Sequence, residues 1–320
     1  MAQMRVLITG VTGFIGSALA AKLVEAGEEV YGLVRFMGQG RGPLPRGVEY
    51  ITADLTDYFS VERAVRLVRP EAVFHLAALS PVSESYFQPA TYAEANYIGT
   101  IHLLEALRRH ARETARVIAV AGTTEMFDAS EDLDGYNEFR PESPYAVSKV
   151  AEVLYAEYMY RAYNLPIVVA IPTNTYGRAP VRQRHFFVEK VVTELLEGKQ
   201  HIYLGNPDAV RDWMFREDHV DAYLAIMRAA LDGRPVFGRR FAFGTGVGRT
   251  TKETAELIMR LIGASAVLHW NAIQRPVETH RIVISKEAIR KAENMLGWRP
   301  KYTLEEGLKT VIKEWREVLG

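Results

Sequence analysis

Two short stretches of the chain contain side chains whose types and spacing suit acid–base chemistry. In SPYAVSKVAEVLYAEY, residues 143–158, Tyr145 and Lys149 are four positions apart and so lie on one face of the helix that this segment predicts. A lysine ammonium near a phenol favours the phenolate and lowers the pKa of the tyrosine, which gives a base that works near neutral pH. Taken alone, the pair is better explained as an ordinary contact on a surface helix.

The second stretch is AGTTEMFD, residues 121–128, in which Glu125 directly follows two threonines. The apolar run RVIAV before it predicts a buried strand. A carboxylate at the end of such a strand is costly to desolvate unless it has a partner or a chemical role. Abstraction of a proton next to a carbonyl is a role that a positioned glutamate can fill.

The elements that position these residues follow a regular order. Short apolar runs alternate with segments of helical periodicity up to Pro172, which predicts a parallel sheet covered on both faces. The predicted fold class is therefore α/β, a doubly wound parallel (Rossmann) sheet with a smaller C-terminal α/β lobe. Strands are expected at 5–9, 30–34, 48–52, 72–76, 116–121 and 167–171, and helices at 14–26, 61–68, 92–109 and 143–163.

After Pro172 the sequence becomes polar, basic and rich in turns. We predict a dinucleotide-binding domain over residues 1–175 and a substrate lobe over 176–320. Within the lobe, the stretch 217–245 is expected to return to the large sheet. The expected helices are 187–196, 217–231, 252–262 and 304–318, and the expected strands are 202–204 and 240–243.

The first predicted strand leads into TGVTGFIG, where Gly10, Gly13 and Gly16 have a GxxGxxG spacing. Glycines let the backbone turn tightly and approach a pyrophosphate, and the helix that follows presents free N–H groups to that anion. Such a triplet can also be no more than a glycine-rich turn. Because the required strand and helix are both present, the context favours a dinucleotide site.

The residue after the second strand predicts which dinucleotide is bound. An acidic residue there would bind the ribose 2′-hydroxyl of NAD, but the chain has Arg35. A guanidinium suits a 2′-phosphate, so NADP is favoured, with NAD possible and a solvated surface arginine as the alternative. Asp54, after the third strand, could meet the adenine amino group or cap the next helix.

The composition limits the remaining classes of function. Lys and Arg number 39 and Asp and Glu number 39, so the totals imply no basic surface and no nucleic-acid partner. The absence of cysteine excludes disulfides, thiolate nucleophiles and Cys-based metal sites, and no metal site is predicted. No apolar stretch approaches the ~20 residues that span a bilayer, and the N-terminus enters a strand without an apolar signal segment. We expect a cytoplasmic protein with no membrane partner.

Five motifs follow one another along the chain: TGVTGFIG, HLAA (75–78), NYIGT (96–100), GTTE and YAVSK. Together they resemble the extended short-chain dehydrogenase/reductase family, and in particular its nucleotide-sugar branch, which includes GDP-mannose 4,6-dehydratases and GDP-4-keto-6-deoxymannose reductases. The resemblance covers nearly the full length and includes GNPDAVRDW at 205–213 and the segment 275–300. It implies an NAD(P)-dependent enzyme acting on a nucleotide-diphosphate sugar, with a GDP-sugar favoured.

The resemblance also implies roles for individual residues. Thr123 would hydrogen-bond the reacting oxygen, Tyr145 would act as general acid and base, and Lys149 would bind the nicotinamide ribose and tune Tyr145. The implied cofactor contacts are Gly10, Thr12, Gly13, Phe14, Ile15, Gly16, Arg35, Asp54, Leu55, Leu76, Ala77, Ala78, Tyr145, Lys149 and Pro172. The implied substrate contacts are Ser80, Thr124, Asn174, Lys190, Arg211, Arg275 and Glu278. For Arg211, a salt bridge with Asp212 or Asp218 is the alternative.

Three reactions in this branch share Thr123, Tyr145 and Lys149. A 4,6-dehydratase also needs a carboxylate near C5 of the sugar, and Glu125 stands where the resembled dehydratases carry it, although the related reductases carry one there too. We therefore predict a NADP-dependent nucleotide-sugar 4,6-dehydratase, with GDP-mannose as the leading substrate; the alternatives are a 4-keto reductase or a 4-epimerase. A catalytically silent dinucleotide sensor is disfavoured because Thr123, Tyr145 and Lys149 are all present.

Some residues depart from the dehydratase pattern. Phe14 and Ile15 replace the usual Gln-Asp of the glycine turn, and TYGRAP follows Asn174 in place of the usual His-Glu or His-Ile. These departures leave the sugar and the oligomer open. The resemblance implies a homodimer that packs through helices 92–109 and 143–163.

Overall fold

The computed structural model describes residues 3–35, 45–128, 130–179, 186–273, 276–277 and 281–320. Its centre is a seven-stranded parallel sheet with the order β10-β6-β5-β4-β1-β2-β3. The predicted α/β class is confirmed. The strands are β1 (Arg5–Thr9), β2 (Glu29–Val34), β3 (Val48–Thr52), β4 (Ala72–His75), β5 (Val117–Ala121), β6 (Ile167–Pro172) and β10 (Arg240–Phe243).

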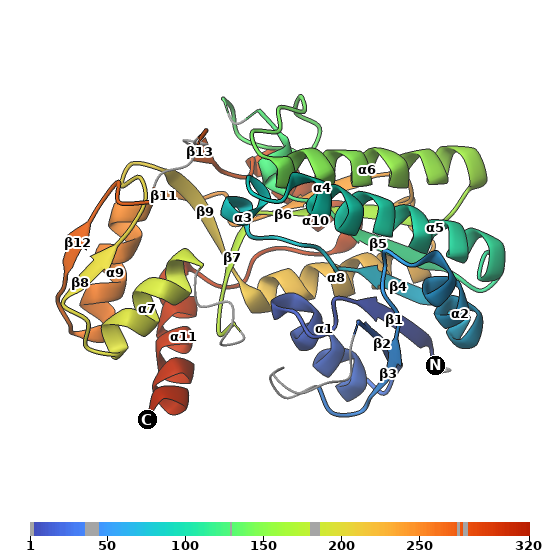
Figure 1. Cartoon of the computed structure of the whole chain (residues 1–320), viewed down its shortest axis with the longest axis horizontal. Coiled ribbons are helices and arrows are strands. Elements are labelled where there is room, and N and C mark those ends of the chain that lie inside the picture. The colour runs from blue at the N-terminus through green and yellow to red at the C-terminus, as the bar shows by residue number, and fades with distance from the viewer. Residues whose placement is uncertain (1–2, 36–44, 129, 180–185, 274–275, 278–280) are drawn as a thin grey trace.

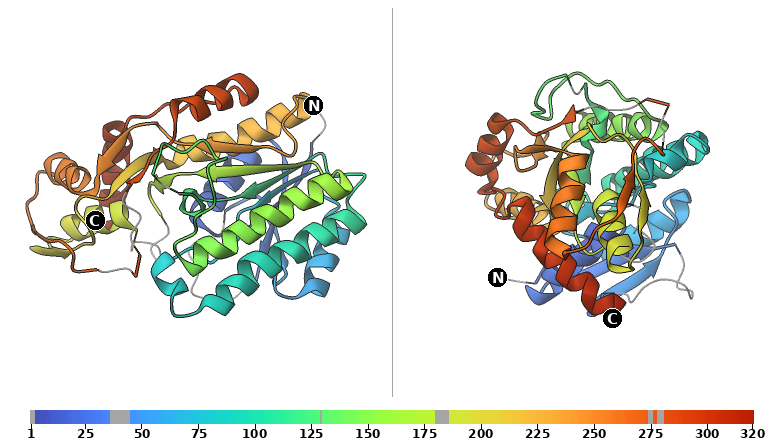
Figure 2. Two further views of the ribbon diagram at one scale, coloured as in Figure 1. Left: turned by 90° about the horizontal axis from the view of Figure 1, so that it is seen from above. Right: turned by 90° about the vertical axis from the view of Figure 1, so that its left-hand side faces the viewer.

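Helices cover both faces of this sheet (Figure 1). Side chains along β1 point alternately to the two faces of the sheet: Val6 and Ile8 enter one apolar core, and Leu7 enters the other. Both faces are therefore apolar and must be covered by helices. The first core is closed by α1 (Phe14–Glu25), α8 (Arg216–Leu231) and α10 (Lys286–Leu296). The second is closed mainly by α2 (Tyr58–Val68), α5 (Gly99–His110) and α6 (Pro144–Tyr163), and Figure 2 shows α5 and α6 side by side.

The helix expected over 92–109 is interrupted. It consists of α4 (Pro89–Tyr92), a π-helical segment Ala93–Ile98, and then α5. The π-helical segment carries Asn96, whose side chain is fully buried against the backbone of Leu79. Such segments insert an extra residue into a helix and often mark functional sites.

A smaller set of elements packs beside one end of the large sheet (Figure 2). Its sheets join β7 (Asn174–Tyr176), β9 (Val210–Phe215), β11 (Gly248–Thr250) and β13 (Arg281–Ile282), and pair β8 (His201–Tyr203) with β12 (Val267–His269). The helices α7 (Phe187–Leu196), α9 (Thr251–Ile262) and α11 (Leu304–Leu319) share a core around Trp315. Capping boxes at Thr250 and Thr303 define where α9 and α11 begin.

The chain crosses between the two parts more than once. After β9 it forms α8 and β10, and β10 pairs with β6 at the edge of the large sheet.

The short helix α3 (Val82–Ser85) lies next to α6. The sequence did not predict α3, α10 or the strands β7, β9, β11, β12 and β13. Within the described residues, no helix has the length and apolar character needed to cross a membrane.

Candidate active site

The turn after β1 forms the floor of a cavity of about 390 Å³ at the carboxyl ends of the central strands. Gly10 has a φ of +73°, and a Cβ on it would lie 2.7 Å from the backbone nitrogen of Ala77. A Cβ on Gly16 would lie 2.2 Å from the carbonyl oxygen of Gly10. Gly13 caps α1 without a side-chain hydrogen bond, so the first turn of the helix offers its N–H groups to a ligand. This shape fits the pyrophosphate of a dinucleotide.

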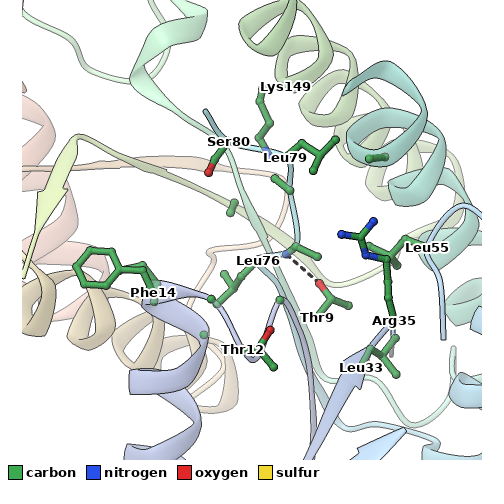
Figure 3. Close-up of a pocket in the computed structure, with 18 of the residues that line it drawn as sticks. Thr9, Thr12, Phe14, Leu33, Arg35, Leu55, Leu76, Leu79, Ser80 and Lys149 are labelled. Atoms are coloured by element: carbon green, nitrogen blue, oxygen red, sulfur yellow. Dashed lines mark hydrogen bonds between the residues drawn. The ribbon is translucent and has the colours of Figure 1, made fainter. Parts of the chain in front are cut away.

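Every residue expected to contact the cofactor lines this cavity, and Ser80 from the expected substrate contacts lines it too. Figure 3 shows Arg35 rising from the end of β2 beside Leu55, with Phe14 on the opposite side of the pocket. Arg35 is exposed. Asp54 bonds Thr56, while Asp57 caps α2, so the helix-capping alternative for Asp54 is wrong.

Some lining residues were not predicted from the sequence. His219 and Tyr223 reach the cavity from α8, and they stack on each other with ring centroids 5.3 Å apart. The two residues are four positions apart and so lie on one helical face, a spacing that was visible in the sequence and could have indicated that they act together. The other unpredicted lining residues are Thr9, Leu33, Val34, Ala53, Thr56, Leu79, Ala95, Ala121, Gly122 and Phe186.

Tyr145 lies in the first turn of α6, which begins where Ser143 accepts a hydrogen bond from the backbone of Ala146. Thr123 hydrogen-bonds the Tyr145 side chain from the turn that follows β5. Glu125 follows in the same turn and is close enough to act on the phenol electrostatically. The structure thus brings Thr123, Glu125 and Tyr145 together, with Lys149 one helical turn further along α6.

The expected lowering of the pKa of Tyr145 by Lys149 is wrong for this structure. Burial raises the pKa of the phenol, the hydrogen bond from Thr123 opposes that rise, and the carboxylates of Glu152 and Glu125 add to it. The Lys149 ammonium is already paired, because its Nζ lies 2.5 Å from Oε2 of Glu152.

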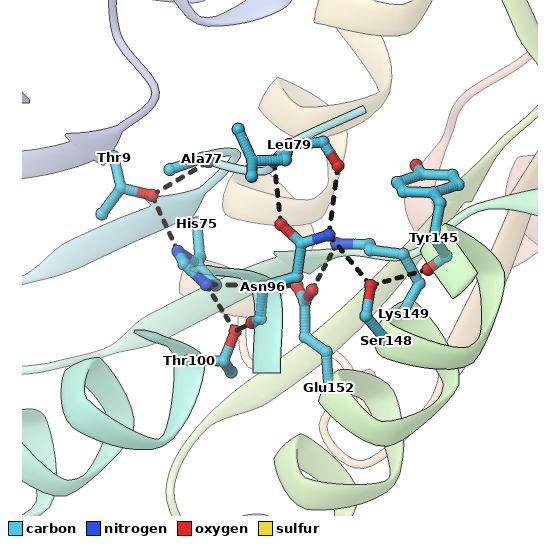
Figure 4. Close-up of polar contacts among 10 residues, drawn as sticks. All are labelled: Thr9, His75, Ala77, Leu79, Asn96, Thr100, Tyr145, Ser148, Lys149 and Glu152. Atoms are coloured by element: carbon cyan, nitrogen blue, oxygen red, sulfur yellow. Dashed lines mark hydrogen bonds and ion pairs between the residues drawn. The ribbon is translucent and has the colours of Figure 1, made fainter. Parts of the chain in front are cut away.

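Buried hydrogen bonds surround Lys149 (Figure 4). Asn96 accepts from the Leu79 N–H at 2.8 Å and donates to the Leu79 carbonyl at 3.1 Å and to Ser148 at 2.9 Å. His75 bonds Thr9 through Nδ1 and Thr100 through Nε2, at 2.7 and 2.8 Å. Burial and the Lys149 charge lower the pKa of His75 to about 3, so the ring is neutral. We call this region, with the glycine turn, the β1–β4 side of the site.

A second group of residues, which we call the β7–β9 side, comes from β7, β9 and the start of α8, and one of them, His219, lines the cavity. Asn174 and Trp213 are partners in the β7–β9 ladder, and each has a buried polar atom, Oδ1 and Nε1, without a hydrogen-bond partner among the described residues. His219 donates to or accepts from Thr175 through Nδ1 at 2.9 Å, and its buried Nε2 is likewise unpartnered in the described structure. Burial lowers the pKa of His219 to about 3.

The other expected substrate contacts have different surroundings. The Lys190 ammonium lies 2.8 Å from Glu194. Arg211 is buried and donates to the Val210 carbonyl. The two carboxylates considered as its partners accept hydrogen bonds elsewhere: Asp212 from residues 245, 246 and 284, and Asp218 from the backbone of residues 301 and 302. Thr124 is buried beside Thr123. Arg275 and Glu278 lie outside the described residues.

The fold and the site define a class. A glycine turn under a dinucleotide-sized cavity, with Tyr145 and Lys149 at its wall and Thr123 beside Tyr145, is the arrangement of an NAD(P)-dependent enzyme of the extended short-chain dehydrogenase/reductase type. The family described as GDP-mannose 4,6 dehydratase matches residues 7–311, and the chain belongs to this family. Among the described residues, no group of three or more acidic or histidine side chains could hold a metal ion.

Similar proteins include both dehydratases and epimerases. A UDP-glucose 4-epimerase of Mycolicibacterium smegmatis is 32% identical, over 98% of this chain and 99% of that protein. GDP-mannose 4,6 dehydratase 1 of Arabidopsis thaliana is 31% identical, over 96% of this chain and 88% of that protein. The solved UDP-glucose 4-epimerase of Thermotoga maritima, with UDP-glucose, has a TM-score of 0.88 and 29% identity, and covers 99% of this chain and 100% of its own.

Proposed function

We propose that the protein is a NADP-dependent nucleotide-sugar 4,6-dehydratase, with GDP-mannose as its leading substrate. The observation that carries the proposal is the position of Glu125, two residues after Thr123 in the turn that ends β5 and within electrostatic reach of Tyr145. An epimerase needs no second carboxylate at this position, whereas elimination of water from the sugar does.

In this proposal each side chain handles a proton at a defined atom. Tyr145 removes the proton from the C4 hydroxyl, while Thr123 holds that oxygen by a hydrogen bond. Glu125 then takes the C5 proton, which the new C4 ketone has made acidic, and gives it to the C6 hydroxyl, which leaves as water. Glu125 next takes a proton from solvent and delivers it to C5, while Tyr145 releases to solvent the proton it took from O4, so the net change is the loss of one water to give a 4-keto-6-deoxy sugar.

A bound NADP would accept a hydride from C4 and return it to C6. The close approach of Gly16 to Gly10 leaves room for the pyrophosphate, and Lys149 is positioned at the pocket wall to meet ribose hydroxyls. Arg35 would face the 2′-phosphate from the end of β2. The absence of an acidic residue at this strand end is what favours NADP over NAD.

The test is incubation with NADP and each of GDP-mannose, UDP-glucose and dTDP-glucose, followed by mass analysis of the sugar nucleotide. The proposal expects GDP-mannose to lose the mass of one water and to become a 4-keto-6-deoxy sugar. Failure of all three to lose water contradicts the dehydratase. Loss of water from a UDP- or dTDP-sugar alone retains the dehydratase and corrects the substrate.

A 4-epimerase is the second candidate, favoured by the glycine turn with Phe14 and Ile15 and by the similarity to the two epimerases. It predicts interconversion of C4 epimers without loss of water or net redox change. A 4-keto reductase would instead consume added NADPH when given a 4-keto sugar. Mass analysis after the incubations with NADP detects the loss of water, NMR of the same products resolves C4 epimers, and a separate incubation of a 4-keto sugar with NADPH detects the reductase.

We also propose a homodimer through α5 and α6. The outer face of α6 exposes Val147, Leu154 and Tyr158, whose exposed fractions are 55%, 45% and 43%. Large apolar side chains gathered on one helix mark an interaction surface. Sedimentation at micromolar concentration should give twice the mass of the 36.0 kDa chain, and a monomer would contradict the proposal.

A further inference from the structure

Glu152 is a completely buried carboxylate directly behind the acid–base pair. It lies three residues after Lys149 on α6, and Oε2 accepts the hydrogen bond from the Lys149 ammonium. Its other oxygen, Oε1, has no hydrogen-bond partner among the described residues and lies 4.0 Å from Nε2 of His75. Figure 4 shows Glu152 extending from α6 toward both groups. A buried charge with one unsatisfied oxygen is costly, so it calls for an explanation.

The groups that face Glu152 come from three elements. Lys149 and Tyr145 belong to α6, His75 to β4 and Tyr223 to α8. His75 does not neutralise the carboxylate, because Thr9 and Thr100 engage both ring nitrogens and the ring is uncharged. Within the described structure, Lys149 is therefore the cation that pairs with Glu152.

The Lys149–Glu152 pair affects both the orientation of Lys149 and the pKa of Tyr145. An ammonium has three N–H donors, and the bond to Glu152 fixes one of them, which directs the others toward the cavity that Lys149 lines. The carboxylate also offsets the positive charge that Tyr145 would otherwise feel, and Glu152 accordingly raises the pKa of Tyr145. Burial raises the pKa of Glu152 itself to about 7 against the opposing effect of Lys149, so the carboxylate is charged above neutral pH.

We propose that Glu152 is a positioning residue that acts through Lys149: it fixes the ammonium at the wall of the cofactor cavity and, by offsetting its charge, keeps Tyr145 in the phenol form. The pH at which Tyr145 begins to act as a base is then set in part by Glu152. The second statement rests on the proposed function of Tyr145, whereas the first concerns cofactor binding alone.

The first arm of the test needs no sugar. The dissociation constant for NADPH is measured by fluorescence for the wild type, Glu152→Ala, Lys149→Met and the double variant. We expect Glu152→Ala to weaken binding about fivefold, the effect of one lost hydrogen bond, and to change it less than about twofold in the Lys149→Met background. Equal losses in both backgrounds, or no loss in either, would overturn the positioning role.

Two further variants separate this role from a fault in folding. Glu152→Asp keeps the carboxylate and should recover at least half of the lost affinity. Glu189→Gln removes another fully buried carboxylate, one that accepts from the Gly177 N–H away from Lys149, and should bind NADPH as the wild type does. If Glu152→Asp binds no better than Glu152→Ala, or Glu189→Gln shows the same loss, the specific role of Glu152 is rejected.

The second arm is the pH profile of kcat/KM with whichever sugar nucleotide the enzyme converts. The Glu152→Gln variant removes a unit negative charge several ångströms from Tyr145. The limb of the kcat/KM profile that reports the titration of Tyr145 should therefore move to lower pH by about one pH unit. An unchanged limb overturns the charge-offset role. If no sugar nucleotide is converted, the proposed function fails while the NADPH arm still decides the positioning role.

Discussion

The β1–β4 side and the β7–β9 side of the site differ in how their buried polar atoms are satisfied. On the β1–β4 side, Asn96 and His75 find protein partners for both ends of their side chains. On the β7–β9 side, Asn174, Trp213 and His219 each bury a polar atom without a partner in the described structure. Buried polar atoms are normally bonded. On the β1–β4 side Asn96 and His75 meet this rule and Oε1 of Glu152 is the exception, whereas on the β7–β9 side Asn174, Trp213 and His219 each leave one polar atom that a ligand could satisfy.

The largest expected effect comes from the proposed acid–base residue. Replacing Tyr145 by Phe removes the proton carrier while Lys149 and Glu152 remain, so kcat should fall by about 10²–10⁴. The affinity for NADPH should stay within about twofold, because the β1–β4 side keeps its hydrogen bonds. Steady-state kinetics and a fluorescence titration measure the two effects, and a variant that retains a tenth of the wild-type kcat would contradict the role of Tyr145.

Glu125→Gln should separate two steps that share the site. We expect loss of water to slow by about 10²–10³, since the amide cannot take the C5 proton, while reduced cofactor still forms from oxidation at C4. Absorbance of the reduced cofactor and mass analysis of the sugar follow the two steps in one reaction. Glu131→Gln, an exposed residue in the following loop, is the matched control and should behave as the wild type. If oxidation at C4 and loss of water slow equally, Glu125 does not act specifically in the elimination of water.

Glu189, which adjoins the β7–β9 side, sharpens the comparison with Glu152 because its partner is a backbone N–H, that of Gly177, at 2.9 Å. Burial raises the pKa of Glu189 to about 7. The folded protein therefore binds this proton more tightly than the unfolded chain, so the stability that it contributes is complete below the usual pKa of 4.5 and is lost as the pH rises through 7.

Relative to Glu189→Gln, the wild type should lose about 3 kcal/mol of unfolding free energy between pH 4.5 and pH 7. Chemical denaturation of both proteins across this range measures the difference. The amide can still accept from Gly177, which keeps the comparison matched. A difference that does not change with pH would show that Glu189 keeps an ordinary pKa in the folded protein.

The smallest expected effect is on substrate affinity, and it tests whether the unpartnered side-chain oxygen of Asn174 bonds the sugar nucleotide. If Asn174 bonds the sugar nucleotide, Asn174→Ala should raise KM for the sugar nucleotide about tenfold, the effect of one hydrogen bond, and leave NADPH affinity unchanged. Separate titrations with each ligand decide this. An equal loss for both ligands would break the distinction between the two sides.

The sequence predicted the β1–β4 side because its determinants are local. A glycine turn between a strand and a helix, and a tyrosine and a lysine four residues apart, can be recognised without knowing the fold. The fold of the large sheet followed from the alternation of apolar runs, since each strand and helix is long enough to show its period.

The resemblance implied Asn174 as a substrate contact, but the strands of the β7–β9 side were not predicted, because they are short and pair across long stretches of chain. β9 pairs with β7, β11 and β13, which lie between residues 174 and 282, and β13 has only two residues. Glu152 was missed for a related reason. In sequence it resembles any glutamate on a surface helix, and only the tertiary packing around α6, which brings His75 of β4 to 4.0 Å from it, buries it.

The central claim, elimination of water at this site, is tested most directly by converting GDP-mannose in deuterium oxide. A 4,6-dehydratase that uses Glu125 at C5 exchanges that proton with solvent, so the 4-keto-6-deoxy product should carry one deuterium, placed at C5 by NMR. A sugar nucleotide that is recovered as a C4 epimer, with its C6 hydroxyl intact and no deuterium at C5, would contradict the account.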